Sequence, residues 1–151
     1  MTVAQFFPIS NVFILPFWLL MIVLPHWVWT RRIIQSPLIV VPSALVYAIL
    51  IIPRLLQIGP ILFSLDISNL AALLATPVGA LIAWAHFQAL DLLGGRWAYL
   101  DSRKRCIPAW FMVPILFLML MLGPIGLLLY LGIQRFYPLK ELQSTSTVAS
   151  A

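Results

Sequence analysis

The chain has 151 residues, of which 63% are hydrophobic and only 9% charged, with a formal net charge of +5. This composition excludes a soluble globular domain and predicts an all-α, polytopic membrane protein. The basic residues flank apolar segments and form no basic face, which argues against a nucleic-acid partner. A single cysteine, Cys106, excludes an intramolecular disulfide and a cysteine-based metal site.

Four apolar segments are long enough for helices that cross a lipid bilayer, since a span needs about 20 mostly apolar residues. We expect one transmembrane domain over residues 1–140, built as a four-helix bundle. Its helices are predicted at about residues 6–29, 37–57, 77–97 and 108–135. The polar tail, residues 141–151, is predicted to be disordered.

Local signals predict where helices begin and bend. The apolar stretch Pro60–Ala75 is too short for a fifth span, so it predicts a short interfacial or re-entrant helix before the third span, capped by Asp66 or Ser68. Thr76 is placed to cap the third span, which begins at Pro77. Prolines inside spans remove backbone donors and predict kinks, most strongly in the Gly-Pro-rich segment 123–126.

The distribution of Lys and Arg predicts the orientation of the chain. The loops after the first and third spans carry six basic residues: Arg31, Arg32, Arg96, Arg103, Lys104 and Arg105. By the positive-inside rule these loops are cytoplasmic and both termini lie outside or in a lumen. The N-terminal segment resembles neither a signal peptide nor a transit peptide, which favours a bacterial membrane protein.

Polar residues inside spans are the natural candidates for chemistry, because a charge at mid-span costs about 2.5–3.5 kcal/mol. In the third span, His86 lies near the middle and Asp91 about 7.5 Å further along the helix. The two point in different directions, so they converge only on a ligand in a cleft or have separate partners. The structural alternatives are an ion pair of Asp91 with Arg96 or with an arginine of the neighbouring loop, and an interhelical hydrogen bond of His86.

Other polar side chains fall on the same helix or on its neighbours. Trp84, Gln88 and Asp91 lie at spacings of four and three residues and therefore share one helix face. Asn11 and Arg54 are further candidates in the first two spans, and Arg54 is close enough in the predicted topology to pair with Asp66. The sequence contains no Gly-rich phosphate loop, HExxH motif or His/Cys cluster, so no metal site is predicted.

Three segments resemble the abscisic-acid-deficient-type family, which is associated with neoxanthin synthase in plants. They are NVFILPFWLLMIVLPHWVWTRR (11–32), TPVGALIAWAHFQALDLLGGRWAYLD (76–101) and GPIGLLLYLGIQR (123–135). The middle segment is the most specific, because apolar bias alone hardly produces the order W-x-H-x-x-x-x-D-L-x-x-G-R-W-x-x-x-D.

The resemblance implies carotenoid metabolism and an isomerase-like action on a membrane-dissolved polyene. Conversion of violaxanthin to neoxanthin is an isomerisation, so it requires no cofactor. His86 and Asp91 would act as the catalytic base and acid. Residues expected to contact a substrate or pigment are Trp84, Gln88, Asn11, Trp18 and Arg96.

The leading alternative is a non-enzymatic accessory subunit that binds carotenoid, chlorophyll or lipid in a larger, photosynthetic membrane complex. A lipid or proton transporter is a third interpretation. Whether it is an enzyme or an accessory subunit, the chain is expected in a cyanobacterial-type plasma or thylakoid membrane, in contact with the lipid bilayer. It is expected there as a homo-oligomer or as part of a larger membrane complex.

Overall fold

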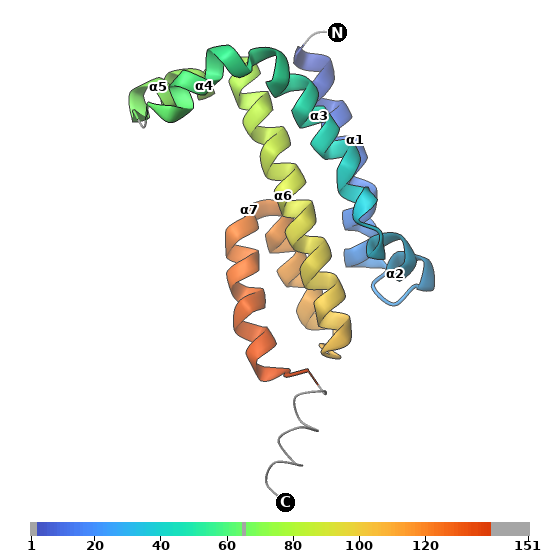
Figure 1. Ribbon diagram of the computed structural model, residues 1–151. Helices are drawn as coiled ribbons and strands as arrows, with labels where there is room; N and C mark the ends of the chain where they lie inside the picture. The colour runs from blue at the N-terminus through green and yellow to red at the C-terminus, as the bar shows by residue number, and fades with distance from the viewer. Residues whose placement is uncertain (1–2, 65, 140–151) are drawn as a thin grey trace, which may run out of the picture. The chain divides into compact units, whose positions relative to one another are not determined.

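The computed structural model describes the backbone of residues 3–64 and 66–139, and the side chains from Phe7 onward within those ranges. All regular secondary structure in the described ranges is helical (Figure 1). The all-α prediction is therefore confirmed. The tail predicted to be disordered, residues 141–151, lies outside the described residues.

The α-helices in chain order are α1 (Val3–Val23), α2 (Val28–Gln35), α3 (Val41–Ile51), α4 (Leu55–Phe63), α5 (Ile67–Leu74), α6 (Pro77–Lys104) and α7 (Ala109–Ile133). Short 3-10 helices are η1 (Pro37–Val40), η2 (Ile52–Arg54) and η3 (Gln134–Phe136).

Among the described residues, three helical segments are long and apolar enough to cross a membrane: Pro37–Phe63, Pro77–Lys104 and Ala109–Phe136. The apolar stretch Phe7–Val23 of α1 is shorter. The chain is therefore a helical membrane protein, but the predicted count of four spans is not confirmed.

The chain divides into two compact units, and α1 and α6 contribute to both. Unit 1 comprises Met1–Pro16 and Pro37–Leu90. Unit 2 comprises Phe17–Ser36 and the chain from Asp91 onward. A single long helix such as α6 can serve two packing units because successive turns of one helix present side chains to different neighbours.

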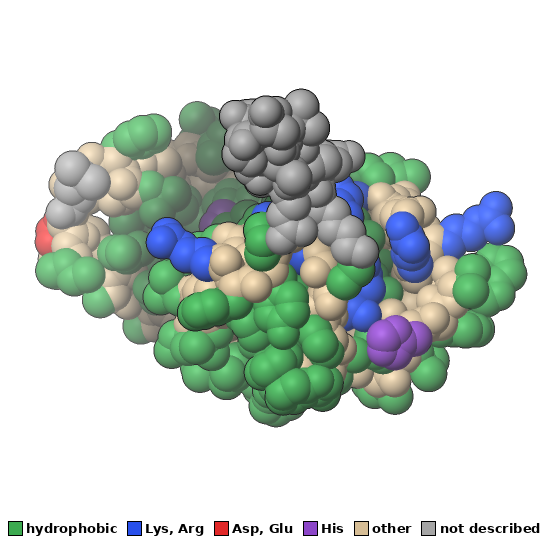
Figure 2. All heavy atoms as spheres, turned by 90° about the horizontal axis from the view of Figure 1, so that it is seen from below, with side chains coloured by type: hydrophobic (Ala, Val, Ile, Leu, Met, Phe, Trp, Pro, Cys, Tyr) green, Lys and Arg blue, Asp and Glu red, His purple; other side chains and the backbone are tan. Residues whose placement is uncertain are grey.

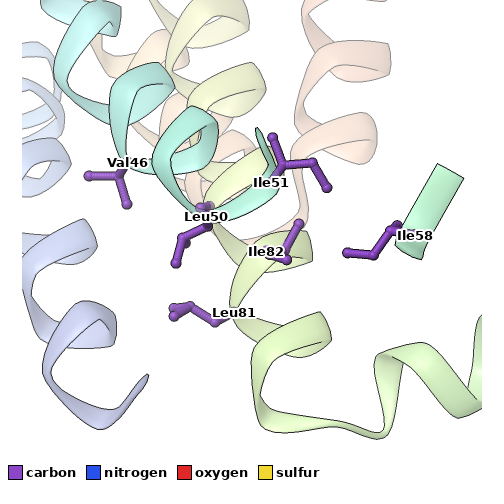
Figure 3. Close-up of a cluster of buried hydrophobic side chains, with 7 residues drawn as sticks. Val46, Leu50, Ile51, Ile58, Leu81 and Ile82 are labelled. Carbon is purple, nitrogen blue, oxygen red and sulfur yellow. The ribbon is translucent and has the colours of Figure 1, made fainter. Parts of the chain in front are cut away.

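Unit 1 has a core of aliphatic side chains from α3, α4 and α6 (Figure 3). Its buried members are Val46, Leu50, Ile51, Ile58, Leu81, Ile82 and Ala85. Figure 1 shows that the chain bends at η2, so that α4 and α5 point away from α3. The helical segment of the second predicted span continues beyond residue 57, to Phe63. The predicted interfacial helix corresponds to the end of α4 and to α5.

Both predicted caps in unit 1 are confirmed. The backbone N–H of Ser68 donates to Asp66 Oδ1 at 3.0 Å at the start of α5. This bond, together with one from the Ser68 hydroxyl, lowers the pKa of the Asp66 carboxyl. The backbone N–H of Gly79 donates to Thr76 Oγ1 at 3.0 Å at the start of α6. The predicted pair of Arg54 with Asp66 is wrong, because Arg54 donates to the carbonyl of Leu50 at 2.8 Å.

Two predicted helix ends in unit 2 also differ from the structure. The first helix was expected to reach Trp29, but α1 ends at Val23 and α2 begins at Val28, because Pro25 has no N–H with which to continue α1. Helix α6 continues past Trp97 to Lys104 and ends with Cys106 at a φ of 56°. The N–H of Ile107 donates to the carbonyl of Ser102 at 2.9 Å, as in a Schellman C-cap.

The largest departure from the sequence prediction is that α7 folds back on itself. Its backbone leaves helical geometry at Leu122 and Gly123, directly before Pro124, and Figure 1 shows the chain reversing there. A Cβ placed on Gly126 would collide with the backbone of Met119. In one continuous helix these residues would be about two turns apart, so the collision requires two arms packed side by side.

The second arm of α7 returns to the end of α6. The Tyr130 hydroxyl donates to Asp101 Oδ2 at 2.6 Å, and Arg105 donates to the carbonyl of Tyr137 at 3.1 Å. The predicted fourth span, residues 108–135, is therefore a helical hairpin, and Ala109–Phe136 qualifies as a span by length and composition but not as one straight helix. A proline without an N–H directly after a glycine at the break explains why the chain reverses here.

The contact between the arms of α7 can be tested by mutation, through its effect on the stability of the protein. Gly126→Ala should destabilise the protein by about 2 kcal/mol or more, because the added methyl meets backbone atoms that cannot move aside. Gly132→Ala is the matched control, since a Cβ at Gly132 meets no atom within 4 Å. Unfolding in detergent, followed by circular dichroism, measures both. Equal stability of the two variants would show that the arms do not touch.

Candidate functional site

A polar cluster in unit 1 joins α1 to α6 through Asn11, Trp84 and Gln88, and we refer to it as the Asn11 cluster. The indole N–H of Trp84 donates to Asn11 Oδ1 at 3.3 Å, and Gln88 Nε2 donates to the same oxygen. Asn11 Nδ2 in turn donates to the carbonyl of Phe7 at 3.0 Å. The structure therefore brings together three residues that the sequence selected as ligand contacts.

The Asn11 cluster contains one buried acceptor that has no partner. Gln88 Oε1 is buried and accepts no hydrogen bond within the described structure. An acceptor left unpaired away from water costs about 1–3 kcal/mol. A ligand that donates a hydrogen bond to this oxygen recovers that free energy.

Aromatic side chains border the same cluster. The rings of Phe7 and Trp84 are tilted against each other with their centroids 5.6 Å apart. Trp84 is 43% exposed and Phe7 48%, so part of each side chain is open to a ligand or to lipid. Exposed aromatic surface beside a buried free acceptor suits a ligand with an apolar body and a hydroxyl at its end.

His86 also belongs to unit 1, where its neighbours are aromatic. Its ring lies 5.2 Å from that of Tyr47 and 6.1 Å from that of Phe87, centroid to centroid. No hydrogen bond of His86 is present within the described part of the chain. Sequence reasoning selected neither Tyr47 nor Phe7 as a neighbour of the site. Periodicity gives the face of a helix but not which helix packs against it.

Asp91 belongs to unit 2, where it lies at the break in α7. A Cβ on Gly123 would collide with the Asp91 carboxylate, so the two residues are in close contact. The predicted ion pair between Asp91 and Arg96 is wrong. Arg96 instead donates from Nε to the carbonyl of Ile34 at 2.9 Å and from Nη2 to that of Gln35 at 2.5 Å. An arginine near a helix C-terminus satisfies carbonyls that the helix leaves unpaired.

Trp18, another predicted ligand contact, is packed inside unit 2. Its side chain is only 1% exposed, and a Cβ on Gly95 would collide with its ring. Its indole nitrogen is buried without an acceptor. Trp18 and Arg96 therefore have structural contacts in unit 2.

Residues near the C-terminal end of α6 bind other parts of unit 2. Trp97 packs edge-on against Tyr130, with centroids 5.2 Å apart, and the Tyr99 hydroxyl donates to the carbonyl of Pro25 at 2.8 Å. Asp101 accepts from Tyr130 and forms an ion pair with Arg105 at 2.6 Å. Among the described residues, no group of three or more His, Cys, Asp or Glu side chains could hold a metal ion.

The shared acceptor of the Asn11 cluster can be tested by Asn11→Leu. The change leaves the donors of Trp84 and Gln88 without an acceptor and should destabilise the protein by about 1 kcal/mol, a typical value for hydrogen bonds between membrane helices. Unfolding by a denaturing detergent measures the loss. Gln57→Leu is the control, because Gln57 is exposed and should tolerate the change. An unchanged midpoint for Asn11→Leu would contradict the hydrogen-bonded cluster.

A family model described as ABA DEFICIENT 4-like matches residues 5–130, a range that includes the Asn11 cluster, His86 and Asp91. No curated protein and no solved structure matches the chain. Because the family match covers most of the sequence, and because the helices are apolar enough for a bilayer, the chain belongs to the ABA DEFICIENT 4-like family and fits a carotenoid-related membrane protein.

Proposed function

We propose that this protein binds a hydroxylated carotenoid at the Asn11 cluster and acts on it as an isomerase-like enzyme of carotenoid metabolism. The observation that carries the proposal is the buried, unpartnered Gln88 Oε1 next to the exposed rings of Phe7 and Trp84. The family match supports the carotenoid as the class of ligand.

The free acceptor selects the chemistry of the ligand's end group. A hydroxyl on the terminal ring of a carotenoid can donate to Gln88 Oε1, whereas an epoxide oxygen or a hydrocarbon ring cannot. The exposed parts of Trp84 and Phe7 then offer apolar contact to the ring and the start of the polyene. The ligand approaches from the bilayer, in which carotenoids dissolve.

In the proposed reaction, one group removes a proton beside the polyene and another protonates an epoxide oxygen. His86 takes the proton from carbon, the electron pair of the broken C–H bond forms a new C=C bond, and the epoxide C–O bond opens. Asp91 gives its proton to the released oxygen, which becomes a hydroxyl. Atoms and electrons balance without a redox cofactor. The absence of an ion pair at Asp91 among the described residues supports its role, because the carboxyl is then available for proton transfer.

A non-enzymatic pigment-binding subunit of a larger membrane complex is the second candidate. It is favoured by the surroundings of His86, which include no hydrogen-bonding group to orient the imidazole within the described structure. Catalytic bases are usually oriented by a third group. Such a subunit would use the Asn11 cluster for binding and would need no chemistry from His86 or Asp91.

Binding can be tested with two carotenoids that differ in their hydroxyl groups. We expect purified protein in mild detergent to bind zeaxanthin about tenfold or more tightly than β-carotene, because only zeaxanthin pairs with Gln88 Oε1. Gln88→Leu should make the two affinities equal, whereas Gln57→Leu should preserve the difference. Absorbance after size-exclusion chromatography measures bound pigment. Equal binding of the two carotenoids by the unaltered protein would contradict the proposed role of Gln88.

Catalysis can be tested separately from binding. His86→Ala and Asp91→Asn should each abolish conversion of an epoxidised, hydroxylated carotenoid while the variant still binds zeaxanthin. Chromatographic analysis of the products measures conversion. Full conversion by both variants would remove the assigned base and acid. Pigment binding without conversion by the unaltered protein, together with a co-purifying larger complex, would favour the accessory subunit.

A further inference from the structure

Helix α2 and the turn before it are fixed to α6 at both ends, all within unit 2. The Tyr99 hydroxyl donates to the carbonyl of Pro25 at 2.8 Å, before α2 begins. Arg96 donates to the carbonyls of Ile34 and Gln35, where α2 ends. Thr30 and Ile34, on the inner face of α2, are fully buried. An eight-residue helix is not stable alone in water, so these contacts determine its position and the direction of its outer face.

The outer face of α2 carries two arginines that form no ion pair within the described structure. Arg31 and Arg32 are exposed, and the Arg32 guanidinium lies 5.7 Å from the centroid of the Trp29 ring. Arg31 and Arg103 both lie close enough to Tyr99 to act electrostatically on its hydroxyl. The fixed helix therefore presents two positive charges at adjacent positions. Like charges brought together in this way favour an anion between them.

The acidic side chains of unit 2 do not neutralise this group. Asp101, one of the two acidic residues described there, is paired with Arg105, and Asp91 lies against Gly123. Arg96, Arg103 and Arg105 all donate hydrogen bonds to other groups of unit 2, whereas in the described structure neither Arg31 nor Arg32 forms an ion pair. The two guanidinium groups on α2 are therefore available to a ligand.

The neighbours of the two arginines indicate what kind of anion would bind. Trp27, Val28 and Trp29 are 49%, 77% and 53% exposed, so cations and large apolar side chains share the same short segment. Figure 2 shows a face of the molecule on which Lys and Arg side chains lie among hydrophobic ones. This combination is typical of a helix at the membrane interface, where apolar side chains enter the acyl boundary and cations meet phosphates.

We propose that α2 is a binding site for the phosphate headgroup of an anionic phospholipid, contacted by Arg31 and Arg32. A guanidinium group presents N–H donors in a planar fork that matches phosphate oxygens. Trp27, Val28 and Trp29 bind the glycerol and acyl region of the same lipid, which a soluble phosphate lacks. The site shares no residue with the Asn11 cluster.

The proposal can be tested with spin-labelled lipids. The full-length protein is reconstituted in phosphatidylcholine vesicles that contain a trace of spin-labelled phosphatidylglycerol or phosphatidylcholine. Electron paramagnetic resonance then measures how strongly each lipid associates with the protein. We expect a preference of up to about 25-fold for phosphatidylglycerol, because each of the two arginines contributes a factor of about five. Arg31→Gln combined with Arg32→Gln should remove most of this preference.

Two control variants test whether the preference depends on positive charge at this site and not on positive charge elsewhere in the chain. Arg31→Lys combined with Arg32→Lys should keep much of the preference because both charges remain, and Arg54→Gln in unit 1 should keep all of it. No preference in the unaltered protein, or an unchanged preference in the double glutamine variant, would overturn the proposal. Displacement of phosphatidylglycerol by soluble glycerol phosphate would indicate a site for free phosphate and would equally overturn it.

Discussion

Backbone carbonyls that a helix end leaves unpaired have no partner in hydrocarbon, and the structure of unit 2 depends on how α6 satisfies them. Arg96 donates to the carbonyls of Ile34 and Gln35 at the end of α2, and Tyr99 donates to the carbonyl of Pro25 after α1. Each unsatisfied backbone group in lipid costs several kcal/mol. The break between α1 and α2 is therefore stabilised by donors that one helix, α6, carries at the right turns.

The two units use different parts of the motif at residues 84–101, which carries the resemblance to the family. Its first part, with Trp84 and Gln88, forms the hydrogen-bonded cluster of unit 1 around Asn11. Its last part, from Gly95 to Asp101, packs and hydrogen-bonds the helices of unit 2. A distinctive order of residues can thus reflect the requirements of folding in lipid as much as those of chemistry. Asp91 lies between the two parts and belongs to neither network of hydrogen bonds.

Features set by neighbours in the sequence could be predicted, and features set by partners far along the chain could not. The caps at Asp66 and Thr76 depend on residues two or three positions away, and the shared face of Trp84 and Gln88 follows from helical spacing. The partner of Arg96 is different. An arginine can pair with a carboxylate or with carbonyls, and only the position of α2 decides between Asp91 and the end of that helix. The reversal of α7 was missed for a related reason, since Gly123 and Pro124 permit either a bend or a turn.

Binding and catalysis make different demands on the structure, and the observations support them unequally. Recognition of a hydroxyl needs only one acceptor held in place, and the Asn11 cluster holds Gln88 by a hydrogen bond to a second helix. Proton transfer needs a base and an acid aligned on one substrate, yet His86 belongs to unit 1 and Asp91 to unit 2. Ligand binding at the Asn11 cluster can therefore be retained where the reaction is not. An enzyme and a pigment-binding subunit could be built from the same scaffold and would differ only in what His86 and Asp91 contact.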